Sequence, residues 1–257
     1  MFEKALDAMS TPGRFVFSVA TVAVGIETLV CARYASHTLG PQYEVIPVIP
    51  WLPAIPWLAY AIGAIFVACG VGVQFTRTRR MAALVLGALM FLGALVLVAP
   101  KYAANVASMG LRTVVLEPLA LASLAWLLPD RGEMPAWLTR LSRYVLALSL
   151  IVFGVDHFLA LAPIGSLIPA WIPWHLFWVA FFGAALIAAG LGFAIGVLDR
   201  PAALGMGLMF GVWVVTLHLP RVLGLYGIPG APTDPDEWSS LLIAVGLWGG
   251  MWSARFS

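Results

Sequence analysis

Eight long apolar segments, separated by short polar breaks, limit what this chain can fold into. Each is roughly the length that crosses a bilayer as an α-helix. They cover residues 14–33, 55–75, 81–100, 110–128, 143–162, 174–197, 201–219 and 238–254. Only 10% of the residues are charged, whereas a soluble protein carries about 25%. The sequence therefore predicts an all-α, polytopic membrane protein with eight transmembrane helices in the lipid bilayer.

An internal repeat relates the two halves of the chain. When the sequence is shifted by 120 residues, 51–101 aligns with 171–221 without a gap, and 14 of the 51 positions are identical, including four glycines. The first helix of each half aligns with a shift of 129 residues, which places Glu27 opposite Asp156. The extra nine residues in the first half belong to its first outer connection.

The repeat predicts how the domains are organised. Each half holds four helices, and because four is an even number both halves cross the membrane in the same direction. We expect two parallel-repeat four-helix bundles. The first covers residues 1–128, a linker covers 129–142, and the second bundle covers 143–257.

The distribution of positive charge predicts the orientation. Ten of the fourteen Lys and Arg residues lie on the side that both termini would share. The positive-inside rule then places both termini in the cytoplasm, with the chain in a bacterial cytoplasmic (inner) membrane. The net charge of +2, without a basic stripe, does not indicate a nucleic-acid partner.

Ionisable residues gather toward the outer side of the second half. Helix 143–162 carries Asp156 beside His157, and the next two helices place His175 and His218 at a similar depth. In the first half only the carboxylate has a counterpart, Glu27. We expect an outward-facing cleft in the second half. The candidate ligand-binding or proton-relay residues are Asp156, His157, His175, His218, Glu27, Trp171, Trp174 and Arg221.

Three interpretations of this cluster remain open. The first is structural. A carboxylate in the middle of a membrane helix costs roughly 2.5–3.5 kcal/mol on insertion, and it would be stabilised by a Trp N–H, a Thr hydroxyl or an Arg from a neighbouring helix. His157, His175 and His218 are candidate metal ligands, but no HxxxH or HxxE pair lies on one helix, so no metal is assigned. A neutral histidine beside a carboxylate also suits proton exchange with a quinone in an apolar pocket.

The chain resembles a known family over nearly its whole length, and the match is stronger in the second half. The stretches "GVDHFL", "LIPAWIPWHLFWVAFFGAALIAAGLG" and "TLHLPR" are similar to the DoxX-like family of bacterial integral membrane proteins, whose unit is a four-helix bundle. That unit would occur twice here. The family takes its name from a subunit of a thiosulfate:quinone oxidoreductase, so the resemblance implies contact with quinone and with a redox partner protein. It assigns no catalytic residue.

Two functions of different classes follow. In the first, the chain is the quinone-interacting membrane subunit of an oxidoreductase, with Asp156 and His157 relaying protons and His175 and His218 bonding the quinone. In the second, it is a non-enzymatic binding or assembly protein that holds a small molecule, a lipid or a partner segment in the same cleft. The sequence has no haem, flavin or iron–sulfur signature, so a stand-alone enzyme is not expected.

Overall fold

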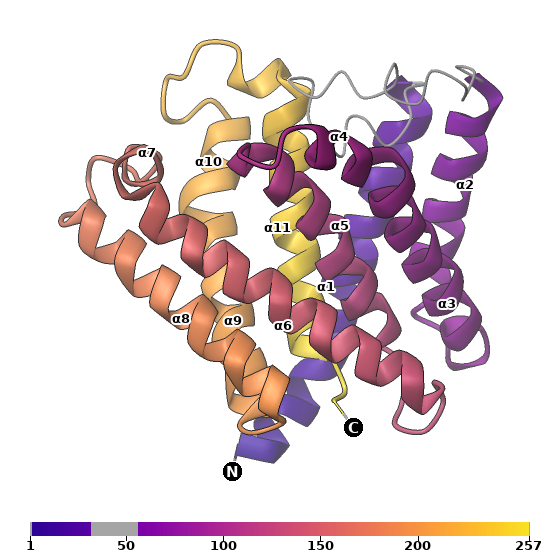
Figure 1. Cartoon of the computed structure of the whole chain (residues 1–257). Coiled ribbons are helices and arrows are strands. Elements are labelled where there is room, and N and C mark those ends of the chain that lie inside the picture. The colour runs from indigo at the N-terminus through magenta and orange to yellow at the C-terminus, as the bar shows by residue number, and fades with distance from the viewer. Residues whose placement is uncertain (1, 32–55, 257) are drawn as a thin grey trace.

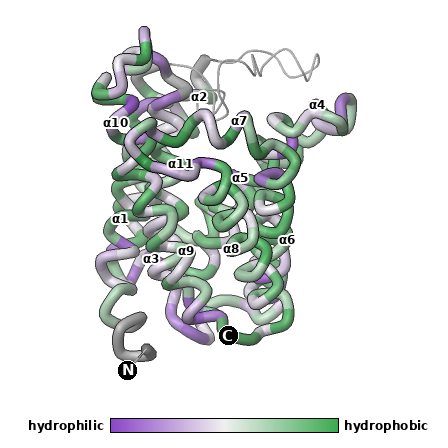
Figure 2. Tube along the Cα trace, turned by 90° about the vertical axis from the view of Figure 1, so that its left-hand side faces the viewer, coloured by the Kyte–Doolittle hydropathy of each residue, from purple (hydrophilic) through white to green (hydrophobic). Residues whose placement is uncertain are grey.

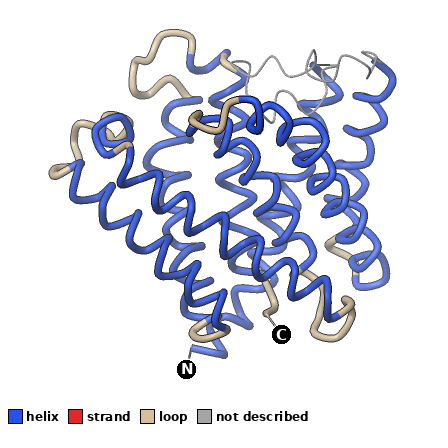
Figure 3. The backbone as a smooth tube through the Cα atoms, viewed as in Figure 1, coloured by secondary structure: helices blue, strands red, loops and turns tan. Residues whose placement is uncertain are grey.

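The computed structural model describes residues 2–31 and 56–256, and within them the chain forms helices joined by short loops, with no β-strand (Figure 3). The helices are α1 (Phe2–Cys31), α2 (Pro56–Gly72), α3 (Thr76–Gly93), α4 (Ala99–Ala104), α5 (Met109–Trp126), α6 (Ala136–Leu159), α7 (Leu161–Gly165), α8 (His175–Ile195), α9 (Asp199–Trp213), α10 (Leu219–Val222) and α11 (Pro235–Ser253). Two π-helical turns, η3 (Ala94–Val98) and η4 (Val214–His218), and one 3₁₀ turn, η5 (Ala231–Thr233), complete the described elements.

The helices have the length and composition of membrane spans. Within the described residues, six helical stretches are long and apolar enough to cross a bilayer: Ala8–Leu29, Thr76–Ala104, Met109–Trp126, Ala136–Leu159, His175–Ile195 and Asp199–Val222. Hydrophobic residues dominate along these helices, and hydrophilic ones collect near the two ends of the bundle (Figure 2). The chain is therefore a multi-pass membrane protein. Each of the eight expected segments contains a helix, and α2, at 17 residues, is apolar but shorter than the six.

The same helix pairs recur in both halves. In the first half α1 packs against α2 and α3 against α5; in the second half α6 packs against α8 and α9 against α11. The other large contacts cross between the halves, because α11 lies along α1 and α5 lies along α6 (Figure 1). The fourth helix of each expected half thus packs on the first helix of the other half, and the two units interlock.

Glycines allow close helix approaches at matching positions of the two halves. A Cβ atom on Gly25 of α1 would lie 2.7 Å from the carbonyl oxygen of Gly63 of α2. A Cβ atom on Gly154 of α6 would lie 2.5 Å from the carbonyl oxygen of Gly183 of α8. Small residues let membrane helices approach backbone to backbone, so the glycine spacing in the sequence sets these two crossings.

A tryptophan fastens α5 to α3, and another fastens α11 to α9. The indole N–H of Trp126 donates to the carbonyl of Leu84, and that of Trp252 donates to the carbonyl of Leu204, each at 3.4 Å. Gly87 and Gly207 lie directly under the two rings, where any Cβ would overlap the indole. The leucines and the glycines of the two contacts are 120 residues apart, as in the sequence repeat, and the two tryptophans are 126 residues apart.

The two π-helical turns lie 120 residues apart, at Ala94–Val98 and Val214–His218. Each is followed after one residue by a proline, Pro100 or Pro220. A proline has no N–H for the i−4 carbonyl, and its ring crowds that carbonyl. A local widening of the helix relieves this crowding, and such turns are frequent at functional sites.

Candidate functional site

Asp156 is held in an ion pair rather than offered to a ligand. Its carboxylate, 7% exposed, accepts hydrogen bonds from the guanidinium of Arg112: Nε lies 3.3 Å from Oδ2, and Nη2 contacts Oδ1. Arg112 lies near the start of α5 and Asp156 near the end of α6. Both carboxylate oxygens are therefore used in joining the two halves.

His157 lies beside Asp156 in sequence but has different partners. Its Nδ1 donates to the carbonyl of Phe153 at 2.7 Å. The imidazole ring stacks on the indole of Trp213, with centroids 5.7 Å apart and planes 12° from parallel. In the described part of the chain no hydrogen bond joins the side chains of Asp156 and His157, so they form no acid–base dyad, and the remaining polar atom of the ring is Nε2.

His218 lies at the end of η4, next to a second ion pair. Arg221 of α10 donates from Nε to Glu237 of α11 at 2.7 Å, and its Nη2 contacts the other carboxylate oxygen. The Nδ1 atom of His218 is buried, and no hydrogen-bond partner for it lies among the described residues. Arg221 thus fastens α10 to α11.

The aromatic residues at the start of α8 face outward. Trp171 and Trp174 are 67% and 77% exposed, and Trp174 precedes the helix in a left-handed backbone conformation with φ of 59°. His175 is the first residue of α8 and is half-buried. This placement suits an interfacial anchor, since tryptophan concentrates at membrane–water boundaries.

The histidines do not assemble into a metal site. Among the residues that the structure describes, no three His, Cys, Asp or Glu side chains lie close enough together to hold a metal ion. His157, His175 and His218 lie on α6, α8 and η4 and keep separate surroundings.

Glu27 has a role that parallels that of Asp156. The hydroxyl of Ser239 on α11 donates to Glu27 Oε1 at 3.2 Å. Glu27 lies on the first helix of its half, and Ser239 lies on the fourth helix of the other half, as Asp156 and Arg112 do. The two carboxylates that the repeat aligns therefore both contact the opposite half.

The main cavity lies elsewhere, among the helices of the first half and closed on one side by α11. Its volume is about 300 Å³, and its walls are apolar side chains of α1, α2, α3, η3, α5 and α11. The hydroxyl of Thr21, which also lines it, donates to the carbonyl of Phe17 on its own helix at 2.8 Å. None of the residues expected to form the site lines this cavity. Its chemistry suits a hydrocarbon group, because the described residues that line it present no unsatisfied side-chain hydrogen-bond donor.

Small residues of the first half leave this space open. Gly93 lines the cavity, and a Cβ atom there would meet nothing within 4 Å. The repeat aligns Gly93 with Trp213, whose ring packs edge-on against Phe182 at 5.5 Å and Phe210 at 5.6 Å. The same alignment pairs Ile62 and Met90, which line the cavity, with those two phenylalanines. In the second half, aromatic rings therefore occupy the positions that correspond to the cavity of the first half.

Glu117 was not singled out by the sequence analysis. It lies mid-helix in α5, immediately before Pro118 and one turn before Leu121, both of which line the cavity. Within the described residues no hydrogen bond or ion pair reaches its carboxylate. The signal in the sequence was a single acid inside the apolar run "TVVLEPLALASLAW", which by itself marks a functional candidate in a membrane helix.

Comparisons with protein-family models, with curated proteins and with solved structures find no match for this chain. The DoxX-like resemblance therefore stays a prediction. The fourth histidine of the chain, His37, lies outside the described residues.

Proposed function

We propose that this chain is a non-enzymatic membrane protein that binds an apolar chain, such as that of a lipid or an isoprenoid, in the cavity of its first half. In this proposal it has eight spans in two parallel four-helix repeats, with both termini in the cytoplasm of a bacterial inner membrane. The matched glycine crossings, tryptophan bonds and π-helical turns support the duplication. The excess of Lys and Arg on one side supports the orientation.

The observation that carries the proposal is the apolar cavity itself. Leu92 and Val96, which line it, are 58% and 45% exposed on the outer surface of the helix, so the cavity adjoins the surface that faces lipid. A hydrocarbon chain that enters the cavity from the bilayer core moves from one apolar medium to another. Its binding would therefore depend on filling the space and gaining van der Waals contacts, rather than on leaving water.

The comparison between the halves supports a cavity that is kept for a ligand rather than a packing defect. An empty apolar cavity destabilises a protein roughly in proportion to its volume. In the second half, Trp213 and its neighbouring phenylalanines occupy the corresponding positions. The first half has Gly93 at that position, and the cost of the space would be offset by a bound chain.

The quinone-interacting subunit remains a prediction, with an isoprenoid tail as the part that the cavity would suit. A quinone head group needs hydrogen-bond donors, and the expected donors, His175 and His218, do not line the cavity. The expected proton relay is engaged elsewhere, because Asp156 pairs with Arg112 and His157 Nδ1 bonds to Phe153. No observation here favours a redox partner protein over the binding role.

Extraction of bound molecules tests the proposal. The protein would be purified in a mild detergent as wild type, as Gly93→Trp and as the matched control Gly205→Trp, since Gly205 is exposed on α9 with no atom near its Cβ. We expect mass spectrometry to find a chain-bearing molecule that co-purifies with wild type and with Gly205→Trp. Gly93→Trp should reduce its amount severalfold by filling the cavity.

Equal amounts of extracted molecule in all three proteins would contradict the proposal. The chemistry of the molecule separates the two functions, because a quinone would make the oxidoreductase subunit the working model. A phospholipid or another redox-inactive lipid would favour the binding role.

A further inference from the structure

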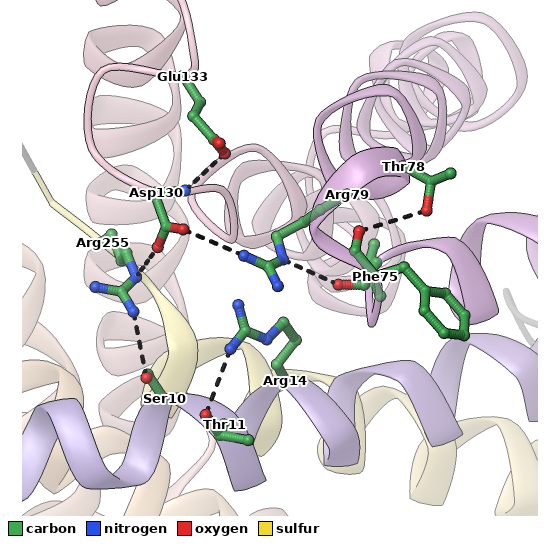
Figure 4. A network of polar contacts seen from close by, with 10 residues as sticks. Ser10, Thr11, Arg14, Phe75, Thr78, Arg79, Asp130, Glu133 and Arg255 are labelled. Carbon is green, nitrogen blue, oxygen red and sulfur yellow. Dashed lines mark hydrogen bonds and ion pairs between the residues drawn. The ribbon is translucent and has the colours of Figure 1, made fainter.

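Three guanidinium groups, of which two contact the same carboxylate, lie together at the end of the bundle that carries both described chain ends (Figures 1 and 4). Arg79 Nη1 lies 3.3 Å from Asp130 Oδ2, and Arg255 Nε lies 3.1 Å from Asp130 Oδ1. Arg14 lies beside them, and within the described residues its guanidinium makes one hydrogen bond, to the Thr11 hydroxyl at 3.5 Å. The cluster therefore holds more positive than negative charge.

Two of the three arginines are buried. Arg14 on α1 is 9% exposed and Arg79 on α3 is 6% exposed, whereas the Asp130 side chain between them is 47% exposed. The charges that act on Arg14 are those of Arg79, Asp130 and Arg255. Glu133 adds a second carboxylate, but it is engaged with the backbone N–H of Asp130 at 3.0 Å. A buried cation without a full counter-charge is costly.

The second half shows the same site in a neutral form. The repeat aligns Arg14 with Arg143 and Arg79 with Asp199. Arg143 and Asp199 form a two-bond ion pair, with Nη1–Oδ1 at 2.9 Å and Nη2–Oδ2 at 2.8 Å. In the first half an arginine stands where the partner acid stands in the second half. One negative charge is thus missing from the first half.

We propose that a phosphate group supplies the missing charge by binding to Arg14, Arg79 and Arg255. Guanidinium groups bind phosphate through paired N–H donors. Basic sites between helices at the membrane surface bind the phosphates of anionic lipids. Arg255 also lines a small hollow whose other lining residues include Ser10, Arg131 and Arg200, so further basic side chains lie near the cluster. The phosphate comes from a lipid head group or from free phosphate.

This site is separate from the apolar cavity, because none of its arginines lines that cavity. The proposal therefore stands or falls independently of the proposed function.

Thermal unfolding of the full chain in a neutral detergent tests it. Three titrants would be added in turn: phosphatidylglycerol, phosphatidylcholine and inorganic phosphate. Arg79→Asp restores the charge pattern of the second half and is the main variant. Arg80→Asp makes the same charge change on the exposed neighbouring residue and is the control. Arg14→Gln removes one guanidinium group, and it replaces Arg79→Asp as the main variant if Arg79→Asp does not fold.

We expect phosphatidylglycerol or inorganic phosphate to raise the Tm of wild type, while phosphatidylcholine does not. Arg79→Asp and Arg14→Gln should weaken the binding about tenfold or more, and Arg80→Asp should leave it near wild type. A shift with inorganic phosphate identifies free phosphate as a sufficient source, and a shift with phosphatidylglycerol alone identifies the lipid.

Three results would overturn the proposal. The first is no shift of wild type with either phosphate-bearing titrant. The second is equal weakening in Arg79→Asp and Arg80→Asp, which would indicate a diffuse charge effect. The third is wild-type binding by a folded Arg79→Asp or Arg14→Gln.

Discussion

Arg112 of α5 and Asp156 of α6 join the two halves of the chain through both carboxylate oxygens and two guanidinium nitrogens. The Asp156 side chain is 7% exposed and that of Arg112 is 24% exposed, so the pair is largely out of water. An ion pair in this setting ties two helices together, and removal of either partner leaves the other as an uncompensated charge.

We therefore expect Asp156→Leu and Arg112→Leu each to destabilise the protein by about 3 kcal/mol, because each leaves one buried charge unpaired. The double variant should recover most of the loss, since it buries no charge. Thermal or denaturant unfolding in detergent would measure the cycle. Additive losses in the double variant would show that the two side chains act independently.

The two tryptophan–glycine contacts provide a matched pair of tests. Gly87→Ala and Gly207→Ala should each lower the free energy of unfolding by about 1–3 kcal/mol, because the added methyl group overlaps the indole of Trp126 or Trp252. Gly205→Ala, with open space at its Cβ, should be neutral or stabilising. Unfolding curves of the three variants give the comparison. A large loss at one of the two matched sites alone would argue against equivalent packing in the halves.

His157 is expected to tolerate replacement by an aromatic ring. In His157→Phe the stack on Trp213 is kept, and the loss is the hydrogen bond from Nδ1 to Phe153, which is worth about 1 kcal/mol. His157→Ala should cost more because it also leaves a void beside Trp213. Comparison of their Tm values checks this order. Selective loss of a co-purifying molecule in a stable His157→Phe would instead assign the ring a binding role.

The sequence predicted the helices well because hydrophobic length is a local property. Each expected segment contains a helix, and the boundary differences have local causes. Helix α6 begins at Ala136 instead of residue 143, since the "AWLTRLS" stretch continues the helix from Pro135. Helix α1 begins at Phe2 and passes through Pro12.

The candidate site was harder to predict because it depends on helix rotation and on which helices meet. The sequence placed Asp156 and His157 side by side, but neighbouring residues on a helix point about 100° apart. Asp156 therefore reaches Arg112, and His157 reaches Trp213. The sequence analysis had allowed for an arginine partner without naming which one. The cavity has no sequence motif, since it arises from the absence of a side chain at Gly93.

The interlocked packing has a consequence for the way the chain is made. Glu27 of α1 and Ser239 of α11 are bonded although they are 212 residues apart, so a helix that is made late covers one that is made early. Until α11 has been made, the face of α1 that packs against it lacks this partner. A protein whose synthesis stopped after α5 would expose the face of α1 that α11 covers. Neither half would therefore be a self-sufficient unit for biosynthesis.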